Sequence, residues 1–466
     1  MNANRNSPPS PLFEGAKQIV LRLRAGGFQS LFAGGCVRDM ILGREPKDFD
    51  VVTDARPEAV LGLFPGSVAV GKAFGVVRVG IKPAGEDSET WYEVATFRTD
   101  GEYDDGRHPR SVTFADEKTD AARRDFTINA MFYDPVENSI RDHAGGREDL
   151  ARKIIRTVGE PDKRFEEDHL RMLRAVRFAE VLGFRIEDAT AEAIRRRAAS
   201  IGRISAERIQ QELARILLEA ERPGRALETL SALGLLREIL PEVEAMRGQE
   251  QPPQFHPEGD VWTHTVMMLD AMRQSPPRPE ARRARLAYAV LLHDVGKPAT
   301  AVKAADRIRF NRHAACGAEM AEAILRRLRL PLAEIRAVSY IIGNHMRFMD
   351  VRRMRKSTLR RFVTEDTFED ELELHRLDCA ASHGDMQNYD FLGQFKKEFK
   401  AEPVLPPPLV GGEDILARGV PRGPLVGRLK QAVYDAQLEG KCRSREEALE
   451  RLEREISRAR EKKTEI

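Results

Sequence analysis

The chain has 466 residues, which is too long for one hydrophobic core and predicts two to four domains. It contains no run of eighteen apolar residues, so we expect no membrane-spanning segment. Four cysteines lie far apart without a CxxC pair, which excludes a zinc ribbon, argues against a disulfide framework and favours a cytoplasmic location: Cys36, Cys316, Cys379 and Cys442.

The formal net charge is only +2, but it is unevenly distributed. Residues 281–362 contain 19 Lys and Arg against 6 Asp and Glu, an excess of +13, which leaves about −11 for the rest of the chain. One basic region in an otherwise acidic protein indicates a polyanionic partner. For a single cluster such as Arg352–Lys356, a solvated helix face is the better interpretation.

Changes in composition divide the chain into segments. Short β-branched runs such as GVVRVGI alternate with helical stretches in the first part, and helical patterns dominate afterwards, with Ser205 as a plausible N-cap. We predict five segments: a polar, proline-rich disordered tail (1–11), an α/β head (12–150), a helical neck (151–245), a helical body that begins with the loop or linker GQEQPPQFHPEG (246–400), and a helical C-terminal tail ending in one solvated helix (401–466).

The first motif of the head is a glycine pair before an expected helix, in LFAGGCVRDM. Gly34 and Gly35 let a backbone approach phosphates without interference from Cβ, and the amides of a helix start favour anions. Arg38 follows one turn later and is placed to pair with a phosphate. The motif therefore predicts a phosphate-binding turn.

A second motif, KDFDVVT, carries two carboxylates in a run that we expect to be a strand. Asp48 and Asp50 are two residues apart, so they share one face of that strand. Glu93, in the strand-like run WYEVATFR, is a candidate third acid, although an exposed strand residue without a catalytic role is the alternative. Three acids can bind two Mg²⁺ ions, one to acidify an attacking hydroxyl and one to hold a triphosphate. This pattern predicts nucleotidyl transfer.

These motifs occur in a familiar order. The runs GGCVRD, KDFDVVT, YEVATFRTDGEYDDGRHPRSVTF, RRDFTINAM, DHAGGREDL, RFEEDHLRMLRAVRF and SAERIQQEL resemble the class II tRNA nucleotidyltransferases, which comprise CCA-adding enzymes and bacterial poly(A) polymerases. The resemblance covers about residues 28–215. It implies a polymerase-β-like head with a mixed sheet, followed by an all-α neck, body and tail. It also implies metal ligation by Asp48 and Asp50, with Glu93 as third acid, and nucleotide binding by Arg124, Asp125 and Asn129.

The neck carries a candidate base-reading pair. Asp168 and Arg171 are three residues apart on an expected helix, hence on one face. A carboxylate accepts and a guanidinium donates hydrogen bonds, which matches cytosine and adenine but not uracil and guanine. The protein would then serve as its own template, whereas the alternative is a surface ion pair worth about 0.2–0.5 kcal/mol. Arg174 and Arg177 continue this face toward base or triphosphate, and Glu167 supports the pair.

The polar loop DGEYDDGRHPR, residues 100–110, corresponds in the resembled family to a flexible loop that helps to switch specificity from C to A. Its presence argues against an enzyme that adds only CC. Arg107 is the residue in this loop that we would test.

The body carries a second set of chemical groups. Seven of the ten histidines lie between His256 and His383, and His264, His293, Asp294 and Asp378 resemble the ligand set of HD phosphohydrolases. Imidazole and carboxylate groups would bind a divalent metal that activates water. We expect His313 and His345 to bind a second metal and Lys297 to contact a phosphate. We interpret three histidines as ordinary surface or core residues: His256, His375 and His383.

The sequence thus predicts a tRNA nucleotidyltransferase that adds CMP and AMP from CTP and ATP to the tRNA 3′ end without a nucleic-acid template. Its head would use Mg²⁺, and its HD domain would use a divalent metal of unknown identity. The alternatives are an A-only or poly(A)-adding enzyme, a phosphohydrolase whose head only binds RNA, and a degenerate HD fold that merely holds tRNA. No membrane partner is expected, and the oligomeric state is left open.

Overall fold

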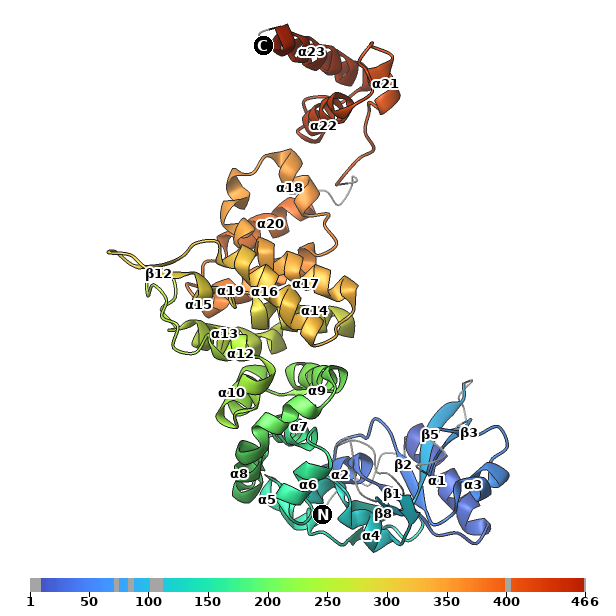
Figure 1. Cartoon of the computed structure of the whole chain (residues 1–466). Helices are drawn as coiled ribbons and strands as arrows, with labels where there is room; N and C mark the ends of the chain where they lie inside the picture. Colours follow the sequence, from blue (N-terminus) through green and yellow to red (C-terminus); the bar gives the residue numbers. More distant parts are fainter. Residues whose placement is uncertain (1–9, 71–74, 83–87, 101–111, 399–403, 465–466) are drawn as a thin grey trace. The chain divides into compact units, whose positions relative to one another are not determined.

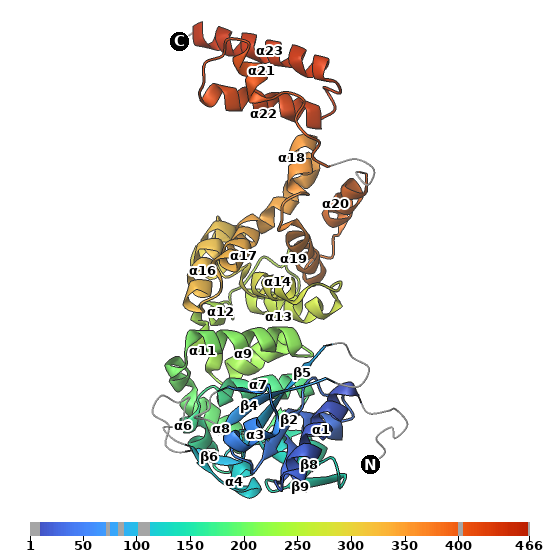
Figure 2. The same cartoon turned by 90° about the vertical axis from the view of Figure 1, so that its right-hand side faces the viewer.

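The computed structural model describes residues 10–70, 75–82, 88–100, 112–398 and 404–464. The chain divides into two compact units, which are described separately. The first comprises Met1–Ala245 with Arg327–Leu330, and the second comprises Met246–Arg326 with Pro331–Ile466. Figures 1 and 2 show a mixed sheet with flanking helices at the start of the chain and helices in the remainder. The predicted α/β head and helical remainder are therefore confirmed.

The head is built on a seven-stranded sheet in the order β3-β4-β5-β2-β1-β8-β9. Strands β2 and β5 are parallel, and the other neighbouring pairs are antiparallel. The strand bounds are β1 Ser30–Ala33, β2 Asp50–Thr53, β3 Val68–Ala69, β4 Val76–Ile81, β5 Thr90–Thr96, β8 Met131–Asp134 and β9 Ser139–Asp142.

One face of this sheet is covered by helices α1, Pro11–Ala25, and α3, Pro57–Leu63. Ser10 accepts a hydrogen bond from the Phe13 amide and so caps α1. Gly15 of α1 packs on Tyr92 of β5 so closely that a Cβ would lie 2.2 Å from the Tyr92 hydroxyl oxygen. Because side chains alternate along a strand, the residues on either side of Tyr92 point to the opposite face.

The opposite face is covered over part of its area by α4, Glu117–Ala122, through a buried cluster that includes Val52, Phe97, Ala121 and Phe132. The remaining head elements surround the sheet: α2 Gly35–Ile41, the β6 Arg98–Asp100 and β7 Val112–Phe114 hairpin, η2 Thr127–Asn129, α5 Gly146–Arg152, and β10 Ile154–Ile155 paired with β11 Arg185–Ile186.

The neck is helical and is organised around α7, Arg171–Leu182, which packs on α9 and α10 and is buried along most of its length. Ser205 does precede α9, but its side chain makes no capping hydrogen bond. The other neck elements are α6 Pro161–Glu167, α8 Asp188–Arg197, η3 Ala198–Arg203, α9 Ala206–Glu219, α10 Pro223–Ala232, α11 Leu235–Ile239 and α12 Pro241–Glu244.

The second unit is centred on α14, Glu280–Leu292, whose C-terminal half is fully buried among α13, α17 and α19. Its other elements are α13 Val261–Ala271, η4 Met272–Gln274, α15 Lys297–Thr300, β12 Ala301–Lys303, β13 Ile308–Phe310, α16 His313–Arg327, α17 Leu332–Asn344, η5 His345–Arg353, α18 Lys356–Phe362, α19 Phe368–Ala381 and α20 Gln387–Lys397.

The C-terminal helices α21 Gly412–Leu416, α22 Pro424–Leu438 and α23 Arg445–Thr464 share a small core. The prediction that the last helix is entirely solvated is wrong, because Ala448, Leu452 and Ile456 are buried in this core. These residues recur every four positions and form an apolar stripe that the surrounding charges conceal in the sequence. Across the described residues, every helix is too short or too polar to cross a membrane.

Candidate active sites

The three predicted head acids lie on the open face of the sheet. Asp50 begins β2, and the pairing of Val51 with Val94 places Asp50 beside Glu93 of the parallel strand β5. Asp48 lies just before β2 rather than within it. Burial of the Asp50 carboxylate by the surrounding chain, although part of the residue reaches solvent, raises its pKa to about 6, with added repulsion from Asp48 and Glu93. Three mutually repelling carboxylates form a site that a cation would stabilise.

The predicted phosphate-binding turn lies next to these acids. Gly34 precedes α2 with φ of +78°, a conformation that favours glycine. A Cβ at Gly34 would lie 3.2 Å from Arg124 Nη1 and 3.8 Å from Asp50 Oδ2. At Gly35 a Cβ would lie 3.7 Å from the nearest side-chain atom, Arg38 Nη2, which is ordinary contact. The Gly34 turn, the Asp50 carboxylate and Arg124 therefore border the same space.

A hydrogen-bonded chain links the predicted nucleotide-binding residues. Arg38 Nη1 donates to Asn129 Oδ1 at 2.8 Å, and Asn129 Nδ2 donates to Asp125 Oδ1 at 3.1 Å. Arg174 Nη2 donates to Asp125 Oδ2 at 2.7 Å. Burial opposes ionisation of Asp125, but the Arg174 guanidinium outweighs it and holds the pKa of Asp125 below its usual range. Arg124 pairs with Asp120 at 3.0 Å and also donates to the Asn129 carbonyl at 3.4 Å.

Two of the three arginines on α7, Arg174 and Arg177, lie over an aromatic ring. The guanidinium carbons of Arg174 and Arg177 lie 5.2 Å and 4.3 Å from the ring centroid of Phe178, and that of Arg38 lies at 5.2 Å. Arg177 is almost fully buried and donates to Glu212 Oε2 at 2.7 Å. The structure thus brings Arg174 and Arg38 together, whereas it commits Arg177 to an internal ion pair.

The prediction that Asp168 and Arg171 share one helix is wrong. Helix α6 ends at Glu167 and α7 begins at Arg171, and Asp168 lies between them in an extended conformation. Asp168 Oδ1 accepts the Leu170 amide hydrogen at 3.0 Å, which competes with continuation of the helix. Asp168 Oδ2 accepts from Arg208 Nη2 at 2.7 Å.

Arg171 is oriented by neighbours other than Asp168. Its Nη1 donates to Glu167 Oε2 at 2.6 Å and to the Arg164 carbonyl at 2.9 Å. Its Nη2 donates to the Arg123 carbonyl at 3.3 Å. Each member of the predicted pair is therefore fixed by its own partners, and Glu167 does contact Arg171.

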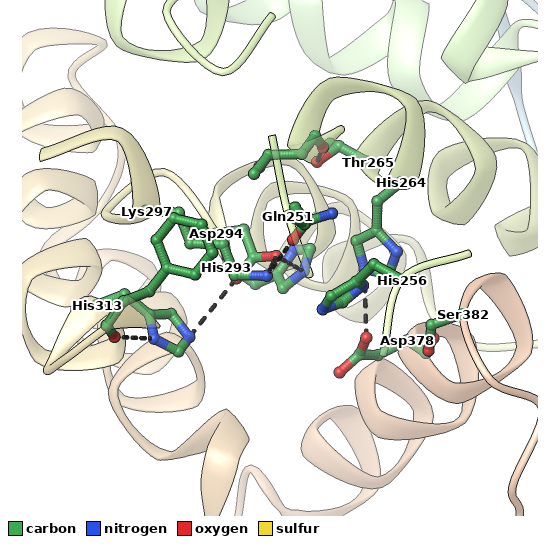
Figure 3. Close-up of polar contacts among 12 residues, drawn as sticks. Gln251, His256, His264, Thr265, His293, Asp294, Lys297, His313, Asp378 and Ser382 are labelled. Atoms are coloured by element: carbon green, nitrogen blue, oxygen red, sulfur yellow. Dashed lines mark hydrogen bonds and ion pairs between the residues drawn. The ribbon is translucent and has the colours of Figure 1, made fainter. Parts of the chain in front are cut away.

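The candidate ligands of the body converge in the second unit (Figure 3). His264 comes from α13, His293 and Asp294 follow α14, and Asp378 comes from α19. Ligand atoms of His264, His293 and Asp378 all lie within 4.8 Å of one another, and so do those of Asp294, His313 and His345. Among the described residues, the head carboxylates do not form a group whose ligand atoms all lie within 4.8 Å of one another.

The backbone fixes the orientation of three of these rings. Nδ1 of His293, His313 and His345 faces the carbonyl oxygens of Val290, Phe310 and Ile342 at 2.9, 2.9 and 2.7 Å. A carbonyl oxygen only accepts, so Nδ1 carries the hydrogen and Nε2 presents a lone pair. The Nε2 atoms of His313 and His345 face each other at 3.2 Å. Two facing lone pairs are favourable only when a cation or a proton lies between them.

Ionisation follows the same pattern. Burial, with repulsion from His293 and His313, lowers the pKa of His345 to about 4 despite the nearby Asp294. Burial also lowers the pKa of His264, but hydrogen bonds to Asp378 and Glu258 outweigh it and raise the value to about 9. His264 Nε2 lies 3.2 Å from Asp378 Oδ1, so a cation bound there would displace a proton.

Buried polar atoms test whether this donor set fits metal ions. The buried Nε2 atoms of this set face carboxylates of the same set: His293 Nε2 lies 3.1 Å from Asp294 Oδ2, and His264 Nε2 lies 3.2 Å from Asp378 Oδ1. Asp294 Oδ1 lies 3.7 Å from His313 Nε2 and 3.9 Å from His345 Nε2. The imidazoles and carboxylates therefore fit divalent cations, which would replace the proton of His264, with Asp294 between the two groups.

An open cavity of about 560 Å³ borders this centre. Its lining includes Asp294, His313, His345 and Asp378, as well as Phe255, Phe310, Arg307 and Arg309. Lys297, predicted to contact phosphate, is buried and lies 2.6 Å from both Asp294 Oδ2 and Gln251 Oε1. Its charge is thus engaged by the metal-ligand candidate itself.

Comparison with known proteins gives a family match for the head, the neck and the HD domain. Residues 30–156 match the family described as the Poly A polymerase head domain, residues 183–247 match the probable RNA and SrmB-binding site of polymerase A, and residues 261–378 match the HD domain. The CCA-adding enzymes of Geobacillus stearothermophilus and Bacillus pumilus are 45% and 44% identical over 226 and 263 residues. The chain thus carries a Poly A polymerase head domain and an HD domain, and it is similar to CCA-adding enzymes.

Alignments with these two relatives cover 48% and 55% of the chain and 54% and 64% of the relatives' own length. The crystal structure of the Bacillus stearothermophilus CCA-adding enzyme in complex with CTP is similar over 97% of this chain and all of that one, with a TM-score of 0.72 and 28% identity. The Thermotoga maritima CCA-adding enzyme complexed with tRNA shares the fold, with a TM-score of 0.61 and 19% identity.

Two residues of the neck escaped prediction. Arg208 and Glu212 lie one turn apart on α9 and hold Asp168 and Arg177. Both belong to the motif SAERIQQEL, which carried the resemblance and in which only Ser205 was named, as an N-cap. Their i, i+4 spacing on the helix that packs on α7 was the available signal.

Two further residues escaped prediction in the HD domain. Glu258 Oε1 accepts from His264 Nδ1 at 2.6 Å and lies 2.9 Å from His256 Nδ1. The interpretation of His256 as an ordinary residue therefore needs correction, because its ring centroid lies 5.1 Å from that of His264. His375 stacks on Phe348 in the core, and His383 is exposed. Arg107 lies outside the described residues.

Proposed function

We propose that this protein is a CCA-adding tRNA nucleotidyltransferase that transfers CMP and AMP from CTP and ATP to the tRNA 3′ end. The observation that carries the proposal is the placement of Asp50 and Glu93 side by side on an open sheet face, next to the Gly34 turn. The relatives named CCA-adding enzymes support the choice of reaction. An A-only or poly(A)-adding enzyme of the same family is the alternative within this site.

Asp48 and Asp50, with Glu93, would hold Mg²⁺, which supplies charge neutralisation for the triphosphate and acidifies the attacking 3′ hydroxyl. Carboxylate oxygens are the ligands that Mg²⁺ prefers. The Gly34 turn leaves room for phosphate oxygens near Arg124, and Arg38 and Asn129 are placed toward the sugar and phosphates. Arg174 fixes Asp125 and thereby holds this surface rigid before the nucleotide arrives.

Base choice would lie at Asp168 and Arg171. Arg208 and Glu167 hold these two side chains in place, so hydrogen-bonding groups are presented in a fixed geometry. A carboxylate beside a guanidinium complements the amine and ring acceptor of cytosine and adenine. Each matched polar contact contributes on the order of 1–3 kcal/mol to discrimination.

Single-nucleotide incorporation tests the proposal. Purified protein is incubated with Mg²⁺, tRNA lacking CCA and either CTP, ATP or both, and product length is determined. Addition of two residues from CTP alone and a third when ATP is present supports CCA addition. Incorporation from ATP alone, without any from CTP, identifies an A-adding or poly(A)-adding enzyme. Incorporation of neither nucleotide contradicts nucleotidyl transfer.

A second activity is favoured by the HD domain. We propose that His264, His293, Asp294 and Asp378 hold a divalent metal that supplies activated water for phosphoester hydrolysis, with His313 and His345 completing a second position. The Nε2 lone pairs that face one another support this assignment. The alternatives are an HD domain that only holds tRNA and a hydrolase whose head only binds RNA. Metal-dependent release of phosphate from nucleoside monophosphates or cyclic phosphates separates these cases.

The proposed tRNA partner fits the basic segment 281–362, although several of its arginines are neutralised within the unit. Arg285 pairs with Glu334, Arg326 with Glu322 and Arg347 with Glu365. The segment would therefore steer RNA through its summed field more than through single contacts. The described thiols are all free, which fits the proposed cytoplasmic location.

A further inference from the structure

An exposed tryptophan lies on the same sheet face as the head carboxylates. Trp91 precedes Glu93 by two residues in β5 and is 40% exposed. The other tryptophan of the chain, Trp262, is 4% exposed. Single exposed apolar residues are common on proteins, but a large ring on the face that carries the candidate catalytic carboxylates is placed to stack with a planar ligand.

The strand register shows what surrounds this ring. Trp91 is opposite Gly80 in β4, which has no side chain, and Arg78 is opposite Glu93. Residues two apart on a strand share a face, so Arg78 and Trp91 lie together beside Glu93. The guanidinium carbon of Arg78 lies 5.6 Å from the Trp91 ring centroid. The face thus presents one aromatic ring and one cation next to the acids, and the Glu89 carboxylate lies over Gly80 at its edge.

The sheet order separates this platform from the nucleotide side. The Gly34 turn, Arg38 and Asn129 belong to β1, α2 and η2, on one side of Asp50. Strands β5, β4 and β3 lie on the other side of β2, away from α2 (Figure 1). If the incoming triphosphate lies on the side of α2, the RNA 3′ end that receives the nucleotide has to approach over β5 and β4.

We propose that Trp91 and Arg78 form a stacking platform for the last bases of the single-stranded RNA 3′ end that is being extended. This inference rests on the proposed function, because it assumes that RNA is the acceptor. Base–aromatic stacking tolerates any base, which suits an acceptor end that changes with every addition. The positive charge of Arg78 also offsets the repulsion between the RNA phosphates and the three carboxylates.

The kinetic test compares Trp91→Ala, Trp91→Phe and wild type in steady-state addition to tRNA lacking CCA. Loss of one stacked base lowers affinity on the order of tenfold, so KM for tRNA should rise by about that factor in Trp91→Ala. The Phe variant should stay within about threefold of wild type, because it retains an aromatic face. KM for CTP should not change in either variant. Val136→Ala, which truncates a head side chain that is 47% exposed, serves as the matched control.

A binding measurement separates this inference from the proposed function. Fluorescence of wild type and of Trp91→Phe is followed during titration with an RNA oligonucleotide that has a single-stranded 3′ end, without nucleotide. Quenching in wild type that is lost in Trp91→Phe supports the platform even if no transfer is detected. Absence of transfer in wild type would instead refute the proposed function.

The inference is overturned by an unchanged KM for tRNA in a folded Trp91→Ala protein. A rise in KM for CTP with no change for tRNA would also overturn it, because Trp91 would then serve the nucleotide side. If Trp91→Ala fails to fold, as judged by circular dichroism, Trp91→Leu and the fluorescence titration decide the question. An apolar side chain without a ring should not restore the affinity for RNA.

Discussion

The candidate cation sites of the head and the HD domain differ in burial and in the way their side chains are oriented. The head places Asp48, Asp50 and Glu93 on an open face, where their mutual repulsion raises the pKa of Asp50 beyond the effect of burial. The HD site buries its ligands and turns Nε2 of His293, His313 and His345 inward through backbone carbonyls. A buried, preoriented set suits a resident metal, whereas an open acidic face suits ions that arrive and leave with nucleotide.

Apart from the loss of transfer expected on removal of Asp50, the largest expected change concerns base choice in the head and neck. Asp168→Ala removes the acceptor while leaving Arg171 held by Glu167. Preference for CTP over UTP should fall by about 1–3 kcal/mol, or roughly five- to hundredfold. The measurement is kcat/KM for each nucleotide on tRNA lacking CCA. Arg208→Met is the matched variant, since it keeps Asp168 but removes its fixed partner, and its effect should be smaller. Unchanged nucleotide preference in Asp168→Ala would refute the template assignment.

Glu258, which contacts the candidate ligand His264, allows a test of whether the HD site is preorganised. Glu258→Ala removes the acceptor that orients His264. Loss of such a partner lowers metal affinity by roughly ten- to hundredfold. Competition titration with a chromophoric chelator measures this change, and His383→Ala, an exposed histidine, is the control. Equal metal affinity in wild type and Glu258→Ala would show that the ligands need no such support.

Two neighbouring glycines test the open character of the head. Gly34→Ala places a Cβ near Arg124 and Asp50 at a positive φ, so transfer should fall by about tenfold and stability by about 1 kcal/mol. Gly35→Ala meets only ordinary contact and should leave both nearly unchanged. Incorporation kinetics and thermal unfolding measure the two effects. Equal losses in both variants would argue against a specific role for the Gly34 turn.

The smallest expected effect is a pH dependence that differs between the sites. With a pKa of about 6, Asp50 keeps its proton below that pH, so Mg²⁺ must compete with a proton there. At limiting Mg²⁺, transfer should be about twofold lower at pH 6 than its plateau at higher pH, and added Mg²⁺ should restore it. His345, with a pKa of about 4, remains neutral across this range. A decline that excess Mg²⁺ does not reverse would assign the titration to another group.

Residue chemistry and motif order predicted which carboxylates the structure places side by side in the head and which histidines and carboxylates it brings together in the HD domain. They did not predict how the chain turns between motifs. The break at Asp168 depends on a local cap to Leu170 and on Arg208, forty residues later, so helical spacing alone misplaced the pair. Glu258 and His256 lie in a loop whose path is fixed by tertiary contacts, and no periodicity marks them.

If one chain carries two chemically independent sites, each activity should be lost only in the variant of its own site. CMP incorporation into tRNA lacking CCA and phosphate release from a nucleoside monophosphate are measured on wild type, Asp50→Ala and His293→Ala. We predict that Asp50→Ala lowers incorporation on the order of a thousandfold and leaves phosphate release unchanged. His293→Ala should abolish phosphate release and leave incorporation unchanged. Loss of both activities in either folded variant would contradict the claim.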